Sequence, residues 1–467
     1  MDSKRLIRAA AVAFLSQGVT AAVNALTVFV LAGKLSAAEY GLWQFFVLLS
    51  SYSGLFHLGL CDGVYLNNGG RELSELDAPK VGTLFRRSFV IQTAVSLLLI
   101  PVLLRFGGAR DRAWAMALAL VYMPIFNADA YLGHVLQATG NTEAYSVSVI
   151  IDRVSFFAFA ILAAAYGLYD FRAYAVAGIL AESVSLAYCI YKTRSIAFAP
   201  HARDGIASMA RRDISVGSRL MISNLSGQLA QGAARLAIIW RYGDAEFGRI
   251  SFVMTLANVF LQLLSQMSMV LFPSLRRENE AARLRFMSGM RSAVGLILPA
   301  VFLAYVPLQL FVTSFLPNFE SGMEYLVLLL PMCLLDGKTN LVATTYFKVR
   351  GRAGELMLIN LFSATLSVAL CFAVASVGGS VGAILAAAVV VSAVRYVAFE
   401  LRCRRLEQRE DREVTLRLFS ELALCGVFVV ATMYLRNIYA VIVYAIAYFI
   451  YLCTRRRELA RLIPIHK

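Results

Sequence analysis

Six charged residues lie deep within apolar stretches of the chain. The acidic ones are Asp129, Glu182 and Asp336, and the basic ones are Arg153, Arg235 and Lys338. A charge in a lipid-like environment costs several kcal/mol unless it meets a partner or lines a water-filled cavity. The carboxylates are candidates for ion coupling, because a carboxylate in such a place can take up a proton. The cations are candidates for binding an anionic group such as phosphate.

The same residues could instead neutralise one another, and the sequence leaves both interpretations open. Asp336 and Lys338 are two positions apart in one predicted helix, so they do not face each other. Their partners come from other helices or from a substrate. Arg395, Glu400 and Asp62 lie closer to the ends of predicted helices, and we expect them to anchor at the membrane surface.

Polar residues recur at helical spacing on three apolar stretches. The sets are Ser16, Thr20, Asn24 and Thr27; Asn224, Gln228, Gln231 and Arg235; and Asn258, Gln262 and Gln266. This spacing places each set on one helix face. Such side chains often join membrane helices by hydrogen bonds, but three long stripes favour a water-filled cavity. Asn24, Asn224, Gln228 and Gln231 are therefore predicted to bind substrate together with Arg153, Arg235 and Lys338.

The composition identifies the elements that must position these residues. Of 467 residues, 59% are hydrophobic and 16% are charged, and the mean hydropathy is +0.68, whereas soluble proteins have about 25% charged residues. A membrane-spanning helix needs about 20 mainly apolar residues, and the chain repeatedly supplies such runs. We predict an all-α integral membrane protein with about 14 transmembrane helices. They cover residues 9–31, 42–65, 86–104, 113–137, 145–166, 173–191, 217–240, 249–273, 292–316, 322–346, 355–376, 380–401, 418–435 and 438–454.

Several other classes of protein are disfavoured. Seven cysteines are scattered without metal-ligand or disulfide spacing, so no metal site and no other cofactor is predicted. The net charge of +15 resides in short loops, which argues against nucleic-acid binding. No phosphate-binding Gly-x4-Gly-Lys-[Ser/Thr] sequence is present, so transport would draw on an ion gradient, the membrane potential or mass action.

Loop charges predict the orientation and the domains. An even number of helices puts both termini on one side, and Lys and Arg mark the cytoplasmic side. The basic loop from Lys192 to Arg219 and both termini are thus predicted to be cytoplasmic. The predicted domains are a six-helix lobe (1–191), a cytoplasmic loop (192–216), a second six-helix lobe (217–401), a cytoplasmic linker (402–417), and two extra transmembrane helices with a basic tail (418–467).

An internal repeat relates the two lobes. The sequence Ala38-Glu39-Tyr40-Gly41 recurs as Ala245-Glu246-Phe247-Gly248, an offset of 245 − 38 = 207. Pro124 and Asp129 map onto Pro331 and Asp336 by the same offset. Because each unit contains six helices, the two units are predicted to be parallel repeats. Transporters are often built in this way, with the substrate path near the middle of the membrane.

Two short segments resemble bacterial polysaccharide-export (Wzx-type, O-antigen) flippases of the multidrug/oligosaccharidyl-lipid/polysaccharide (MOP) superfamily. They are residues 35–43 (LSAAEYGLW) and residues 58–64 (LGLCDGV), the latter leading into Gly69-Gly70-Arg71. The resemblance implies a bacterial inner-membrane flippase, not an enzyme, that moves an undecaprenyl-pyrophosphate-linked oligosaccharide by alternating access. It also implies two C-terminal helices that accommodate a lipid tail. Implied partners are this substrate, membrane lipids and, in some systems, a polysaccharide polymerase or another biosynthetic membrane protein.

Two alternatives remain at this stage. A drug or cation antiporter of the same superfamily would favour an acidic cavity and usually twelve helices. A membrane-bound polysaccharide polymerase or ligase would have a long outer loop with catalytic residues, and no outer loop of the predicted topology exceeds about a dozen residues.

Overall fold

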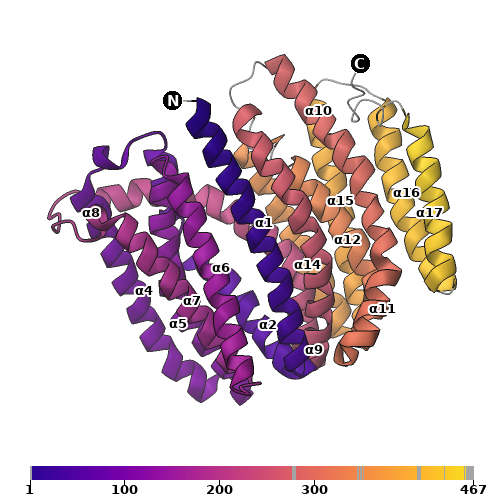
Figure 1. Ribbon diagram of the computed structural model, residues 1–467, viewed down its shortest axis with the longest axis horizontal. Helices are drawn as coiled ribbons and strands as arrows, with labels where there is room; N and C mark the ends of the chain where they lie inside the picture. Colours follow the sequence, from indigo (N-terminus) through magenta and orange to yellow (C-terminus); the bar gives the residue numbers. More distant parts are fainter. Residues whose placement is uncertain are drawn as a thin grey trace. The chain divides into compact units, whose positions relative to one another are not determined.

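The computed structural model is helical, as predicted. It describes residues 3–275, 280–343, 346–347, 350, 352–407, 412–435, 437–456 and 458, and in these residues every regular element is a helix. The longer elements (Figure 1) are α1 (Ser3–Lys34), α2 (Ala37–Ser51), α3 (Leu60–Asn68), α4 (Ala78–Phe106), α5 (Arg110–Ala138), α6 (Thr142–Ala165), α7 (Phe171–Lys192), α9 (Ile206–Leu275), α10 (Glu280–Ile297), α11 (Tyr305–Phe315), α12 (Leu326–Lys338), α14 (Ala353–Ser376), α15 (Val381–Glu407), α16 (Arg412–Tyr434) and α17 (Asn437–Thr454).

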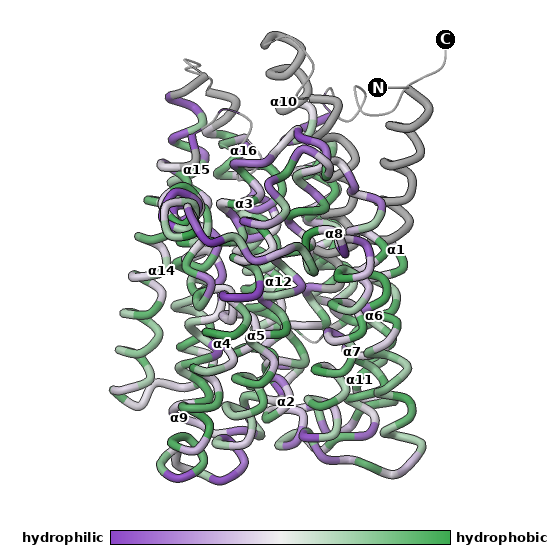
Figure 2. The backbone as a smooth tube through the Cα atoms, turned by 90° about the vertical axis from the view of Figure 1, so that its left-hand side faces the viewer, coloured by the Kyte–Doolittle hydropathy of each residue, from purple (hydrophilic) through white to green (hydrophobic). Residues whose placement is uncertain are grey.

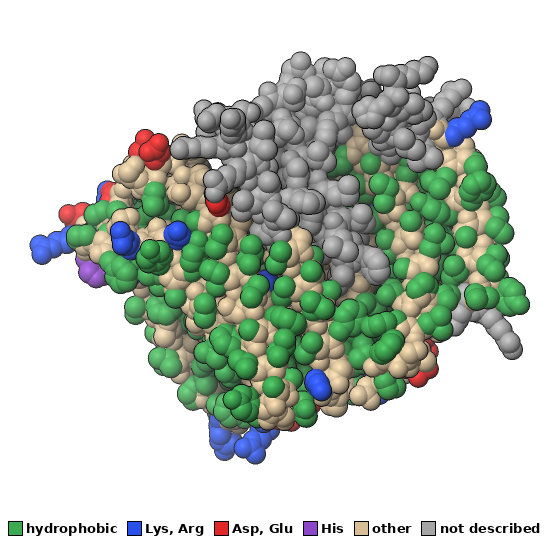
Figure 3. Space-filling view, in the orientation of Figure 1, with side chains coloured by type: hydrophobic (Ala, Val, Ile, Leu, Met, Phe, Trp, Pro, Cys, Tyr) green, Lys and Arg blue, Asp and Glu red, His purple; other side chains and the backbone are tan. Residues whose placement is uncertain are grey.

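The helices have the length and hydropathy of membrane spans. Nine of them, within the described residues, can cross a membrane, and a tenth span results if one bent pair counts as a single crossing. Gly18–Lys34 and Ile438–Thr454 are shorter apolar helices. In Figure 2, most of the helix bodies have the colour of hydrophobic residues, and many of the turns have the colour of hydrophilic residues. Hydrophobic side chains cover much of the described part of the face seen in Figure 3. Many large apolar side chains are exposed, for example Leu98 at 72%. The protein is a multi-pass membrane protein.

The chain forms two compact units, Met1–Leu225 and Ser226–Lys467. In the first unit, α5 packs against α4 and α7, and α6 packs against α1 and α7. In the second, α15 packs against α12 and α14, and α16 packs against α17. Within the described ranges, every predicted span falls on one or more of these helices. The predicted count of about 14 is consistent with this arrangement.

The second span differs from its prediction as one helix over 42–65. The structure divides it into α2, a short 3₁₀ helix (Ser53–His57) and α3, with a bend of 60°. Leu58 and Gly59 at the break have φ values of 52° and 89°. Gly59 adopts positive φ at no steric cost, whereas Leu58 has the less favourable left-handed backbone of a residue with a Cβ. Hydropathy alone does not detect the break, since both halves are apolar.

Helix boundaries reproduce the repeat. α9 contains one residue with non-helical backbone, Gly243, where two helices meet. Its counterpart is Ser36 (36 + 207 = 243), the N-cap between α1 and α2. Prolines inside α5 and α12 also correspond, at Pro124 and Pro331. The repeat mates Tyr40 and Phe247 are both fully buried. α16 and α17 have no counterpart in the first half.

Residues 35–43 and 58–64, which carry the family resemblance, include side chains and glycines with clear structural roles. The Glu39 carboxylate accepts a hydrogen bond of 2.8 Å from the Phe171 backbone N–H, so it caps the first turn of α7. Gly59 and Gly63 let α3 approach α9 closely. A Cβ on Gly63 would lie 2.0 Å from the Asp213 carbonyl oxygen, and a Cβ on Gly217 would lie 2.0 Å from the Gly59 carbonyl oxygen. Small residues four apart permit such helix crossings.

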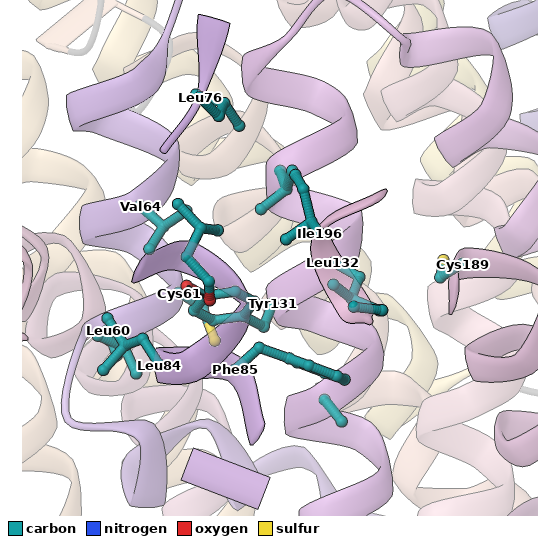
Figure 4. Packing of buried hydrophobic residues seen from close by; sticks show 14 of the residues in the cluster. Leu60, Cys61, Val64, Leu76, Leu84, Phe85, Tyr131, Leu132, Cys189 and Ile196 are labelled. Atoms are coloured by element: carbon teal, nitrogen blue, oxygen red, sulfur yellow. Dashed lines mark hydrogen bonds between the residues drawn. The ribbon is translucent and has the colours of Figure 1, made fainter. Parts of the chain in front are cut away.

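The apolar core of the first unit surrounds this crossing. Leu60, Cys61 and Val64 of α3 belong to one cluster with Phe85 of α4 and Tyr131 of α5 (Figure 4). The Tyr131 hydroxyl donates to the Val81 carbonyl at 3.1 Å. The second half of the broken span is therefore packed into the apolar core of the unit.

Candidate functional site

An acid–arginine cluster, defined here as Tyr122, Asp129, Asp152, Arg153 and Glu182, lies in the first unit. Its members come from α5, α6 and α7. Glu182 occupies the middle of α7, 182 − 171 = 11 residues after its first residue and 192 − 182 = 10 before its last. Asp129 and Asp152 lie close enough to Glu182 to interact electrostatically with it. Two of the predicted ion-coupling residues are thus near each other.

Glu182 is the most deeply placed member of the cluster. Its side chain is 6% exposed and accepts a hydrogen bond of 2.8 Å from the Tyr122 hydroxyl. Arg153 interacts electrostatically with Glu182, and its Nε lies 3.3 Å from Asp152 Oδ2. The Arg153 side chain is nevertheless 45% exposed although it lies near the middle of α6. Among the described residues, three carboxylates here face one guanidinium, so the fully ionised cluster would be negative.

Asp129 and its repeat mate Asp336 have different surroundings. Ser185 donates a hydrogen bond of 3.3 Å to Asp129, and Ser392, at 185 + 207 = 392, is hydrogen-bonded to Asp336. Asp336 also pairs with Arg395 at 3.6 Å. The position equivalent to Arg395 in the first unit is Tyr188 (188 + 207 = 395). The repeat thus keeps the aspartate and serine but supplies the arginine in the second unit.

Ion pairs neutralise the buried charges of the second unit. The ammonium group of Lys338 contacts the Glu421 carboxylate of α16 in an ion pair whose side chains are 4% and 0% exposed. Arg291 Nε lies 3.6 Å from Glu400 Oε1, and these side chains are 10% and 9% exposed. Asp336 and Lys338 thus have partners on other helices, as their spacing required. The expectation that Arg395 and Glu400 reach the membrane surface was wrong, because both side chains are buried in ion pairs.

The predicted substrate-binding residue Arg235 lies on α9 just before the Gly243 break. Its Nε donates to the Ser251 hydroxyl at 3.3 Å, and its guanidinium lies 5.3 Å from the Phe247 ring centroid. Along the same helix, Asn224 and Gln228 are exposed and Gln231 is half-buried. Asn24 of α1 is also half-buried. The side chains of Ser16, Gln262 and Gln266 lie outside the described residues. Lys338 lies at the end of α12 and is therefore not part of this polar stripe on α9.

The sequence did not predict two members of the acid–arginine cluster, Asp152 and Tyr122, or the partner of Lys338, Glu421. Asp152 is the immediate neighbour of Arg153, and that adjacency was a usable signal. Tyr122 looked like an ordinary aromatic residue of an apolar helix. Glu421 appeared to lie near a helix end, because the apolar run begins near residue 418, but α16 already begins at Arg412. Polar residues preceding the apolar run extend this helix and move Glu421 into its interior.

Comparisons with known proteins agree with this architecture. The family model described as "Polysaccharide biosynthesis protein" matches residues 86–278. The lipid II flippase MurJ, in an inward closed conformation, aligns with a TM-score of 0.68 at 10% identity, over 97% of this chain and 100% of that chain. The chain has the fold of the MOP superfamily. The MOP fold also appears in an inward-facing multidrug resistance MATE transporter, with a TM-score of 0.60 at 14% identity over 85% of this chain and 100% of that chain. No match was found among curated proteins.

The expected resemblance to polysaccharide-biosynthesis flippases is confirmed by the family model and by the MOP fold. The solved proteins with this fold are membrane transporters.

Proposed function

We propose that this protein is a flippase that moves an undecaprenyl-pyrophosphate-linked oligosaccharide across a bacterial cytoplasmic membrane by alternating access, with both termini in the cytoplasm. Arg153 carries the proposal. Its side chain is 45% exposed near the middle of a membrane-spanning helix, where a cation is costly unless it serves a cavity or a ligand. Guanidinium groups bind phosphate through paired N–H donors.

The C-terminal helices support a lipid-linked substrate over a drug. The alignment with the lipid II flippase leaves 3% of 467 residues, about 14, unmatched. This is fewer than the 23 residues of α16 or the 18 of α17, so part of each helix is matched. The multidrug transporter alignment leaves 15%, about 70 residues, unmatched. The fold therefore agrees better with a flippase that has an additional helix pair.

The acid–arginine cluster would couple transport to protons. Tyr122 is hydrogen-bonded to Glu182, and Asp129 and Asp152 lie nearby, so a proton bound at Glu182 would relieve repulsion among the carboxylates. The described residues contain no group of three or more His, Cys, Asp or Glu side chains that could hold a metal ion. In this proposal Asp129 and Glu182 exchange the proton, and Asp336 stays paired with Arg395.

The excess of carboxylates also favours a second candidate, a cation or drug antiporter. Deleting the gene in its host separates the two functions. A flippase predicts loss of surface polysaccharide and accumulation of its lipid-linked precursor. An antiporter predicts unchanged polysaccharide and greater sensitivity to cationic drugs, and this outcome would overturn the flippase proposal.

The role of Arg153 is tested by complementing that deletion strain. A charge-assisted hydrogen bond contributes about 1.5–3 kcal/mol, so Arg153→Ala should reduce substrate affinity about ten- to a hundredfold while leaving membrane insertion intact. Arg153→Lys, which keeps the charge, should retain part of the export. Arg105→Ala is the matched control, because Arg105 lies at the end of α4 beside Phe106. Equal export by Arg153→Ala and the control would refute this assignment.

A further inference from the structure

The Lys338–Glu421 ion pair joins the extra helix α16 to α12 of the second lobe. Both side chains are almost fully buried. The Tyr396 hydroxyl of α15 donates to Glu421 Oε2 at 2.6 Å, and Lys338 Nζ lies 3.4 Å from the same hydroxyl. Side chains from α12, α15 and α16 thus form one small buried polar cluster in the second unit.

Gly295 of α10 packs directly against this polar cluster. A Cβ at position 295 would lie 2.8 Å from Glu421 Oε1 and 3.3 Å from Lys338 Nζ. The ion pair therefore occupies the space that any side chain at this position would need. Its helix α10 contains a second glycine, Gly289, where a Cβ would meet nothing within 4 Å. The two glycines form a matched pair for testing.

Tyrosines of α17 continue the attachment beside the ion pair. Tyr444, Tyr448 and Tyr451 are four and three residues apart, so they share one helix face. Their hydroxyls donate to the carbonyl oxygens of Pro299, Leu296 and Gly295 at 2.8, 2.6 and 3.1 Å. Pro299 has no N–H to offer the Gly295 carbonyl four residues earlier, and Tyr451 supplies that missing donor. Inside a membrane such a carbonyl needs a partner.

We propose that the Lys338–Glu421 pair is a latch that fixes helices α16 and α17 to the second lobe, and that Glu421 thereby withholds Lys338 from substrate. The helix pair then moves with this lobe as one body during transport. Lys338 serves as a positioning residue, and the binding of an anionic head group falls to the more exposed Arg153. The attachment of the helix pair does not depend on which molecule is transported, whereas the roles of Lys338 and Arg153 toward an anionic head group rest on the proposed function.

Cys425 provides a natural probe of the latch. It lies one turn after Glu421 on α16, is 8% exposed, and is close enough to Lys338 and Glu421 to interact electrostatically with them. Cys453 is exposed, whereas Cys371 of α14 is fully buried. Alkylation of the full-length protein with N-ethylmaleimide, followed by mass spectrometry of each cysteine, therefore reports separately on the latch and on the rest of the lobe.

Removing one partner leaves the other charge buried and unpaired, which strongly favours an open state. Lys338→Met and Glu421→Gln should each raise the Cys425 labelling rate about a hundredfold or more, with Cys371 still protected. The double variant Lys338→Met/Glu421→Gln strands no charge and keeps an acceptor for Tyr396, so it should restore protection. Gly295→Ala should also increase labelling, whereas Gly289→Ala should not.

Three labelling results would overturn the latch. Cys425 could stay protected in both single variants, it could be labelled equally in the double variant, or Cys371 could become exposed in parallel with it, which would mean that the pair holds the whole lobe. Export by the double variant completes the test. Normal export shows that transport does not need the Lys338 charge. Lost export with Cys425 protected would instead assign Lys338 to substrate and refute its withholding by Glu421.

Discussion

The two repeat-related aspartates should differ in how much stability the protein loses when each is replaced by asparagine. Asp336→Asn leaves Arg395 buried, at 2% exposure, without its carboxylate partner. Asp129→Asn strands no arginine, because Tyr188 occupies the position equivalent to Arg395. We therefore expect Asp336→Asn to destabilise the protein, and Asp129→Asn to leave it stable but to change the ion dependence of transport.

The size of the difference follows from the ion-pair geometry. At 3.6 Å between Arg395 Nη1 and Asp336 Oδ1, an effective dielectric constant of about 20 gives an attraction of about 5 kcal/mol. Breaking a buried pair by removing one partner typically costs about 3–5 kcal/mol, which agrees. For Asp129, an asparagine oxygen can still accept the Ser185 hydrogen bond, so the loss should be about 1 kcal/mol or less.

The assay is thermal unfolding of the purified variants in detergent, with Asp336→Asn/Arg395→Met as the compensated control. The Asp336→Asn variant should melt well below the wild type, the double variant should recover most of the loss, and Asp129→Asn should melt near the wild type. Equal destabilisation by the two single variants would refute the reasoning from the repeat, and so would an unchanged melting temperature for Asp336→Asn.

Two further predictions concern packing and topology. Gly63→Ala should prevent folding or strongly lower thermal stability, because its Cβ would lie 2.0 Å from the Asp213 carbonyl oxygen. Gly70→Ser is the milder comparison, since a Cβ at Gly70 would meet nothing within 4 Å and the variant tests backbone strain alone. Equal melting temperatures of the two variants would contradict the close crossing of α3 and α9. An alkaline-phosphatase fusion at Gly205 should be inactive if the basic loop is cytoplasmic, and strong activity would overturn the predicted orientation.

The helical fold was predictable because a membrane-spanning segment must satisfy its backbone hydrogen bonds internally, as a helix does. Each apolar run had to form a helix, and the repeat offset of 207 placed equivalent prolines and aspartates in equivalent helices. The break at Leu58 and Gly59 was not predictable from hydropathy, since the residues on both sides are apolar. The close approach of Gly63 to α9 next to the break is a tertiary contact, which hydropathy does not encode.

The candidate site was predictable only in part. The rarity of charge within apolar runs identified Asp129, Arg153 and Glu182, and the structure brings these three together. The rarity of a buried charge does not identify its partner. The pairing of Lys338 with Glu421 follows from the packing of α12 against α16, which the sequence alone does not specify. Charge type alone could not distinguish a ligand-binding cation from one already neutralised by a neighbouring helix.

The most direct test of the central proposal is translocation of the lipid-linked oligosaccharide in reconstituted vesicles under an imposed proton gradient. The account predicts that the gradient accelerates wild-type translocation and that Glu182→Gln removes this acceleration while leaving the protein folded. The compensated variant Asp336→Asn/Arg395→Met should keep the gradient dependence. Translocation by Glu182→Gln with the same gradient dependence as the wild type would contradict the account.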